Sequence, residues 1–146
     1  MGYHAEAYYL TSHGDDPEML SSPEDVDAFI DRLLEQPIEN NLAEMYLVER
    51  LQPEESFPNH QFYVGVDRER GVGALKFNDA DGGFASWAPW DAEADSPSYY
   101  CLMGNETEFP AGSDVPIDFV RRAVKEFLAS GGQRPTSVQW QEDTTL

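Results

Sequence analysis

Two segments with helical periodicity, separated by a long series of short alternating segments, constrain the fold of this chain more than any other feature. In the first helical segment Ser22 precedes Pro23, Glu24 and Asp25. This places an N-cap, a first-turn proline and two acids at the positive end of a helix dipole. The first apolar stripe is Val26, Phe29, Ile30, Leu33 and Leu34, before Pro37, and the second is Ile117, Val120, Val124, Phe127 and Leu128, between Pro116 and Gly131-Gly132.

The remaining segments have the aromatic and β-branched alternation that is typical of strands. They are residues 4–10, 44–51, 62–66, 72–77, 84–88, 98–103 and 136–141, with 107–109 extending one edge. Short turns at 67–71 and 78–83 join consecutive strands, and loops cover 11–21 and 89–98. Consecutive strands with short turns favour antiparallel pairing. We therefore predict one α+β domain over residues 1–146: an antiparallel meander sheet of about five to seven strands, with two helices packed on one face.

The charge of the chain is unusual. Nine basic residues stand against 28 acidic ones, which gives a formal net charge of -19. Such a field repels phosphate backbones, so we expect no direct binding of nucleic acid. Two explanations remain open at this point: acidity that maintains solubility in a general or salt-rich setting, and a surface made for a basic partner.

The distribution of the acids favours the second explanation. Between Lys76 and Arg121 there is no Lys, Arg or His, although acids and aromatic residues are frequent. Uninterrupted acid over this length projects a field of one sign, which attracts a cationic partner. The predicted partner-binding residues are Asp79, Asp81, Trp87, Trp90, Asp91, Glu93, Asp95, Glu106 and Glu108. For Trp87, a core position on a strand is the competing interpretation, and Trp90 is the better candidate for an exposed anchor.

The sequence offers little for catalysis. His4, His13 and His60 have no Cys or Glu partner at metal-ligand spacing, so no metal site is predicted. Asp79 and Asp81 resemble part of a calcium loop, but acids are missing from its first and twelfth positions, and a hairpin turn explains them better. We predict no cofactor and no enzymatic activity. The open alternative is a small hydrolase that uses the carboxylate pair Glu106 and Glu108.

Three further observations indicate where in the cell the protein is expected to be. Cys101 is the single cysteine, which excludes an internal disulfide framework. The N-terminus shows no basic region followed by an apolar stretch, and no apolar run approaches the ~20 residues of a membrane helix. We therefore expect a cytoplasmic protein with no membrane partner.

Several motifs together resemble a known family. They are Tyr63-Val64-Gly65-Val66-Asp67-Arg68-Glu69-Arg70-Gly71-Val72-Gly73-Ala74-Leu75, Gly104-Asn105-Glu106-Thr107-Glu108-Phe109-Pro110, Val115-Pro116, Gly131-Gly132, Pro135 and Trp140. This combination is similar to the first-numbered immunity family of bacterial polymorphic toxin systems, over about residues 22–140. The motifs are structural rather than catalytic.

The resemblance implies an α+β fold and a cognate toxin that the protein neutralises in the producing cell. Members of that family are usually encoded beside toxins with deaminase domains. Our hypothesis from the sequence is that residues 87–98, with Asp79, Asp81, Glu106 and Glu108, cover a basic active-site groove of such a toxin. A general acidic interaction module without a toxin partner is the remaining alternative.

Overall fold

One antiparallel sheet organises the molecule. The computed structural model describes residues 2–52, 58–90 and 95–143. Its main sheet has eight strands, in the order β10-β6-β5-β4-β3-β1-β2, with the short β9 paired to β5. The strands are β1 (Ala5–Tyr8), β2 (Glu18–Leu20), β3 (Leu42–Leu47), β4 (Gln61–Asp67), β5 (Val72–Asp79), β6 (Gly82–Trp87), β9 (Val115–Pro116) and β10 (Gln139–Glu142). The predicted α+β class and the meander, here β3 to β6, are confirmed.

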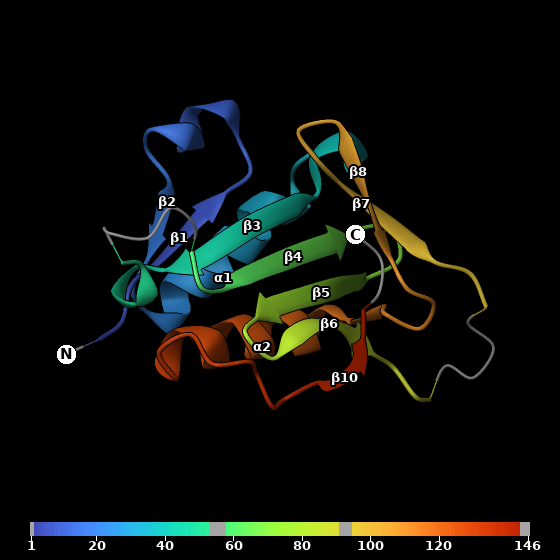
Figure 1. The fold of residues 1–146 in the computed structure, drawn as a ribbon. Coiled ribbons are helices and arrows are strands. Elements are labelled where there is room, and N and C mark those ends of the chain that lie inside the picture. Colours follow the sequence, from blue (N-terminus) through green and yellow to red (C-terminus); the bar gives the residue numbers. More distant parts are fainter. Residues whose placement is uncertain (1, 53–57, 91–94, 144–146) are drawn as a thin grey trace.

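Two helices cover one face of this sheet, as the sequence predicts. Helix α1 (Pro23–Leu34) packs on β4 and helix α2 (Ile117–Ala129) on β5, and the helices contact each other (Figure 1). The Ser22 side chain accepts a hydrogen bond from the Asp25 backbone N–H at 3.1 Å, so the predicted N-cap is present. Within the described residues, no helix is long and apolar enough to span a membrane.

The core lies between the helices and alternate residues of the strands. Phe62, Phe77 and Phe127 form an aromatic cluster in which the Phe62 and Phe127 ring centroids are 4.7 Å apart. Because successive strand residues point to opposite faces, Gln61 and Tyr63 point away from this core. The outer face of the sheet therefore carries the polar and tyrosine positions.

A second, two-stranded sheet packs against part of that outer face. Strands β7 (Ser98–Leu102) and β8 (Asn105–Phe109) form a hairpin, at the right of the sheet in Figure 1. Tyr100 is buried directly over Gly65, where a Cβ atom would come within 2.7 Å of the ring. The Asn41 side chain accepts a hydrogen bond from Cys101 N at 2.9 Å. The hairpin is thus fixed by one close backbone approach and by a buried amide.

The hydroxyl group of Tyr100 is also hydrogen-bonded. Its hydroxyl donates to Asp114 Oδ1 at 2.7 Å, while Arg70 and Ser98 donate to Asp114 Oδ2. One carboxylate therefore joins the hairpin to the β4–β5 turn.

The structure differs from the sequence prediction mainly at element ends. Strand β2 lies inside the predicted loop 11–21, next to a 3₁₀ turn, η1 (Thr11–Gly14). Strand β3 ends before η3 (Val48–Arg50), and η2 (Ile38–Asn40) precedes it. The segment 107–109 belongs to a separate hairpin and does not lengthen the main sheet. The final strand begins at Gln139, because the backbone of Thr136 and Ser137 is held by the Glu126 carboxylate of α2.

His60 is buried at the edge of the core, and its environment leads us to expect that the stability of the protein depends on pH. Its Nε2 accepts a hydrogen bond from Leu47 N at 2.7 Å, which requires the neutral ring. Burial, with help from the Arg50 charge, lowers its pKa from 6.5 to about 4. The unfolded chain therefore takes up more protons between these two values, and stability falls as the pH falls through that window.

We expect the His60 contribution to make the protein about 2 kcal/mol less stable at pH 5 than at pH 7. Urea unfolding at both pH values measures this. His60→Gln keeps an acceptor for Leu47 N and should remove most of the difference. An equal loss in the variant would show that other groups cause it.

Candidate partner-binding cleft

A cleft opens between the β7–β8 hairpin and the outer face of the sheet. Its volume is about 700 Å³. Strands β4 and β5 form the floor, the hairpin forms one wall, and Asp143 with Gly82 and Gly83 at the start of β6 forms the rim. The lining residues are Gln61, Tyr63, Lys76, Asn78, Asp79, Gly82, Gly83, Tyr99, Glu106, Thr107, Glu108 and Asp143.

The cleft is acidic. Four carboxylates, on Asp79, Glu106, Glu108 and Asp143, line it together with the ammonium of Lys76, so its formal net charge is -3. Lys76 Nζ lies 3.0 Å from Asp143 Oδ2, and both side chains are more than nine-tenths buried. The same ammonium lies 4.9 Å from the centre of the Phe109 ring. Lys76 thus ties the floor to the rim and the hairpin, while Glu106 and Glu108 are exposed to solvent.

Tyr99 and Glu108 stand side by side on the hairpin wall. The Tyr99 hydroxyl donates to Glu108 Oε1 at 3.2 Å, and the negative charge of Glu108 raises the pKa of Tyr99. Glu106 and Glu108 are two residues apart on β8, so they point to the same side of one strand. They do not face each other across a reaction centre, as the two carboxylates of a glycosidase do.

The structure brings together only part of the predicted site. Asp79, Glu106 and Glu108 line the cleft, and Asp81 lies on the turn next to Asp79, whose Oδ1 accepts a hydrogen bond from Asp81 N. Their role in binding stays a prediction.

Trp87 is 40% exposed and lies against Gly112, so the interpretation of Trp87 as a core residue is wrong. It follows Ser86 at the end of β6, where alternation turns its ring away from the helices. Trp90 is 58% exposed, and its ring centroid lies 5.8 Å from that of Phe119 on α2. Neither tryptophan lines the cleft.

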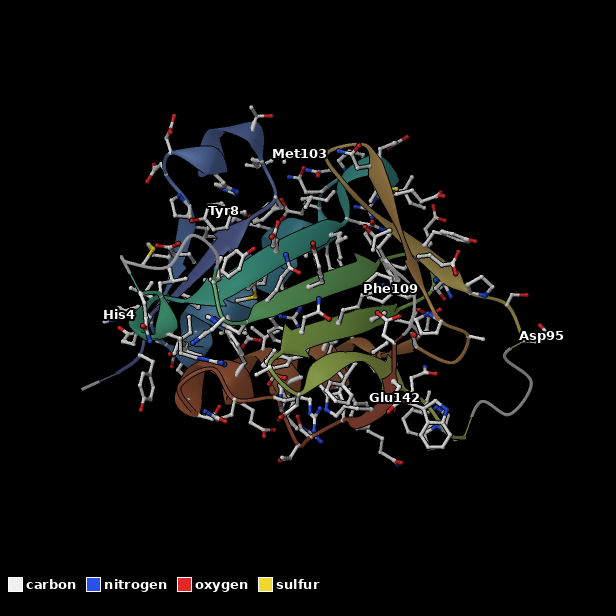
Figure 2. All side chains as sticks on the ribbon, in the orientation of Figure 1. His4, Tyr8, Asp95, Met103, Phe109 and Glu142 are labelled. Atoms are coloured by element: carbon white, nitrogen blue, oxygen red, sulfur yellow. The ribbon has the colours of Figure 1, made fainter. Side chains whose placement is uncertain are left out.

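Of the three acids in the predicted loop, Asp91 and Glu93 lie outside the described residues. Asp95 is exposed. Figure 2 shows it beyond the hairpin, on the opposite side of the molecule from Tyr8. The described members of the predicted site therefore fall into two groups: Asp79, Asp81, Glu106 and Glu108 lie in or beside the cleft, whereas Trp87, Trp90 and Asp95 lie outside it.

The structure also reveals residues that sequence reasoning missed. Next to the cleft residue Tyr63, the outer face of β1 and β3 carries Tyr8 and Tyr46, which lie opposite Glu44 and Glu6 in the strand pairing. The Tyr8 hydroxyl donates to Glu6 at 2.6 Å, and the Tyr46 hydroxyl donates to Glu44. The available signal was the alternation Glu-x-Tyr in both β1 and β3, at positions that point away from the core.

Hydrogen bonds connect this region to the cleft. Asn78 donates to Gln61 at 3.2 Å, and Gln61 donates to Glu44 Oε1 at 2.7 Å.

Burial, assisted by Glu6, raises the pKa of Tyr8 to about 12, and burial is also the main cause of the raised pKa values of Tyr46 and Tyr63. At neutral pH these three hydroxyls are therefore protonated. In the part of the chain that the structure describes, no three His, Cys, Asp or Glu side chains are arranged to hold a metal ion.

A comparison with protein-family models identifies the relatives of the chain. The model described as "Immunity protein Imm1" matches residues 14–142, which is most of the sequence. The chain belongs to the Imm1 family of immunity proteins. The match includes every element from β2 to β10 and thus all cleft residues except Asp143. No curated protein matches the sequence.

Membership in Imm1 confirms the family that the sequence motifs indicated. It implies that the partner is a cognate toxin, and it favours a binding role over a catalytic one. For this Imm1 member, the cleft is the concave surface that is built from those same motifs: the central hairpin β4–β5 gives the floor, and Gly104–Pro110 includes the wall strand β8.

Proposed function

We propose that this protein binds and neutralises a cognate toxin that acts on nucleic acid inside the producing cell, and that it does so without catalysis. The toxin class we propose is a deaminase, which follows from the resemblance stated above. The observation that carries the proposal is the acidic cleft, with its net charge of -3 and its exposed Glu106 and Glu108. An enzyme that holds nucleic acid needs a basic groove, and an acidic, concave surface is complementary to the walls of that groove.

The distribution of ion pairs supports this reading. Within the part of the chain that the structure describes, five of the nine basic residues form ion pairs with carboxylates: Arg32, Arg70, Lys76, Arg121 and Lys125. On the helix layer, Arg121 and Lys125 of α2 pair with Asp27 of α1, so part of the acid there is neutralised internally. The cleft, by contrast, keeps an excess of carboxylates, which directs the negative field toward this side of the molecule.

The exposed residues Trp87, Trp90 and Asp95 form a second region of the same proposal. Trp90 is an exposed aromatic residue that rests on α2, and such residues are frequent anchors of interfaces. Asp91, Glu93 and Asp95 follow it in the sequence. In this proposal the toxin contacts both the cleft and this second region, and the protein works in the cytoplasm.

Co-expression tests the proposal directly. The C-terminal toxin domain encoded by the neighbouring gene is induced in a bacterial host, with and without this chain. We expect growth to be restored by the chain, together with loss of the toxin's deaminase activity in a purified mixture. An inactive toxin variant controls for the burden of expression. Growth arrest despite soluble, folded immunity protein would contradict the proposed function.

A further inference from the structure

A hollow on the outer face of β1 and β3 lies apart from the cleft and has a different composition. Its volume is about 390 Å³, and it is lined by Tyr8, Leu10, Thr11, Gly14, Glu44, Tyr46 and Met103. Tyr46 also lines a neighbouring hollow that reaches Gln61, Asn78 and Asp79, which in turn line the cleft. A partner that fills the cleft can therefore extend across the sheet to this tyrosine hollow. In Figure 2, Tyr8 and Met103 lie near the upper end of the sheet face.

The tyrosine hollow combines flat aromatic surface with one carboxylate. The rings of Tyr8 and Tyr46 have centroids 6.1 Å apart and an interplanar angle of 71°, so they form two walls of a corner. Leu10 and Met103 add apolar surface and are 36% and 48% exposed. This is the environment in which the apolar stem of a long cationic side chain is buried while its head meets a charge.

Glu44 supplies that charge. Both the Tyr46 hydroxyl and Gln61 donate to its Oε1 atom, which fixes the orientation of the carboxylate. Within residues 2–52, 58–90 and 95–143, Oε2 of Glu44 receives no hydrogen bond, and no Lys or Arg forms an ion pair with Glu44. The hollow thus holds an oriented carboxylate beside two aromatic faces.

The geometry points to this hollow as the receptor for an arginine side chain of the toxin. A planar guanidinium can stack on a tyrosine ring while it donates to a carboxylate, and it is more weakly hydrated than the ammonium of lysine. The inference rests on the proposed function, since it names the chemistry of the toxin segment that reaches beyond the cleft.

A peptide titration tests the chemistry without the toxin. The probes are acetyl-Gly-Arg-Gly-amide and the same peptide with citrulline, which has the same shape and no charge. We expect the arginine peptide to cause saturable shifts in the NMR signals of residues that line the tyrosine hollow, and the citrulline peptide to cause none. Equal effects of both peptides, or shifts confined to Glu106 and Glu108, would overturn the inference.

The toxin domain then tests the role of the hollow in the complex. We expect Glu44→Gln, which keeps the acceptor for Tyr46 and Gln61, to weaken toxin binding by about tenfold or more. Tyr46→Phe keeps the ring and should change affinity by less than about threefold. Glu35→Gln, at the end of α1 on the opposite face, makes the same change in net charge and is the matched control. Unfolding curves establish that each variant is folded.

The outcomes separate the two proposals. If Glu44→Gln binds the toxin normally while neutral variants of the cleft do not, the arginine receptor is wrong and the proposed function stands. If the toxin does not bind the unmodified chain at all, the proposed function fails, whereas the peptide result still decides the chemistry of the hollow. A double-mutant cycle that couples Glu44 to one toxin arginine confirms both.

Discussion

Asp79→Asn, Glu106→Gln and Glu108→Gln, combined in one variant, are expected to weaken toxin binding by at least about 100-fold. The amides keep the shape of the cleft and remove three of its four carboxylate charges. Loss of one member of a desolvated charge pair costs ~2–5 kcal/mol, and about 1.4 kcal/mol corresponds to tenfold in affinity. Because fewer charge pairs form, the dependence of the affinity on salt concentration should also become flatter.

Titration calorimetry with the toxin domain at several salt concentrations measures both effects. A matched control carries Glu24→Gln, Asp31→Asn and Glu35→Gln, which change the net charge equally but lie on the helix layer. The control should reduce the affinity only slightly, through the long-range field. Equal weakening by the two triple variants would mean that overall charge, and not the cleft, determines binding.

Gly73→Ala is expected to destabilise the fold by about 3 kcal/mol or more, the largest effect on stability that we predict. Gly73 is buried on β5, and a Cβ atom there would lie 2.4 Å from the backbone oxygen of Gly65 and 2.8 Å from a Val120 methyl group. The first conflict is with backbone, so it can be relieved only if β4 and β5 shift in their pairing. Thermal unfolding should show a Tm lower by roughly 6–12 °C.

Gly14→Ala serves as the control for this substitution. Nothing lies within 4 Å of a Cβ atom at Gly14, and its backbone does not require a glycine. Its stability should stay within about 0.5 kcal/mol of the parent. If Gly73→Ala were equally mild, the close approach of β5 to β4 and α2 would not be a constraint on the fold.

The sequence was sufficient for the elements whose signals are local. Ser22 and Pro23 predicted the start of α1, because a cap and a first-turn proline act within one turn. The alternation of Phe62, Val64 and Val66 predicted the buried side of β4. Strand β2 was not predictable in this way, since its three residues are held by pairing with β1 and carry too few positions to show a period.

The cleft and the tyrosine hollow were only partly predictable for a related reason. Glu106 and Glu108 were found because they lie in a stretch without basic residues, which is a property of the sequence. Glu44 and Tyr46 lie in ordinary surroundings in the sequence, and their meaning comes from the pairing of β3 with β1 and β4. Lys76 also has no distinctive signal in the sequence. In the fold it is buried against Asp143, which lies 67 positions later in the chain. Such contacts depend on register, which no local signal encodes.

The attachment of the β7–β8 hairpin has a consequence for how immunity proteins of this kind can diversify. The hairpin is held from below, by Tyr100 on Gly65 and by Asn41 on the backbone of Cys101. Its solvent side carries Tyr99 and Glu106, whose side chains are exposed. Substitutions there leave the hydrophobic core intact, so they are cheap in stability. Because we propose this wall as a toxin contact, we expect a lineage to exchange it as its toxin changes, while the scaffold that presents the wall stays the same.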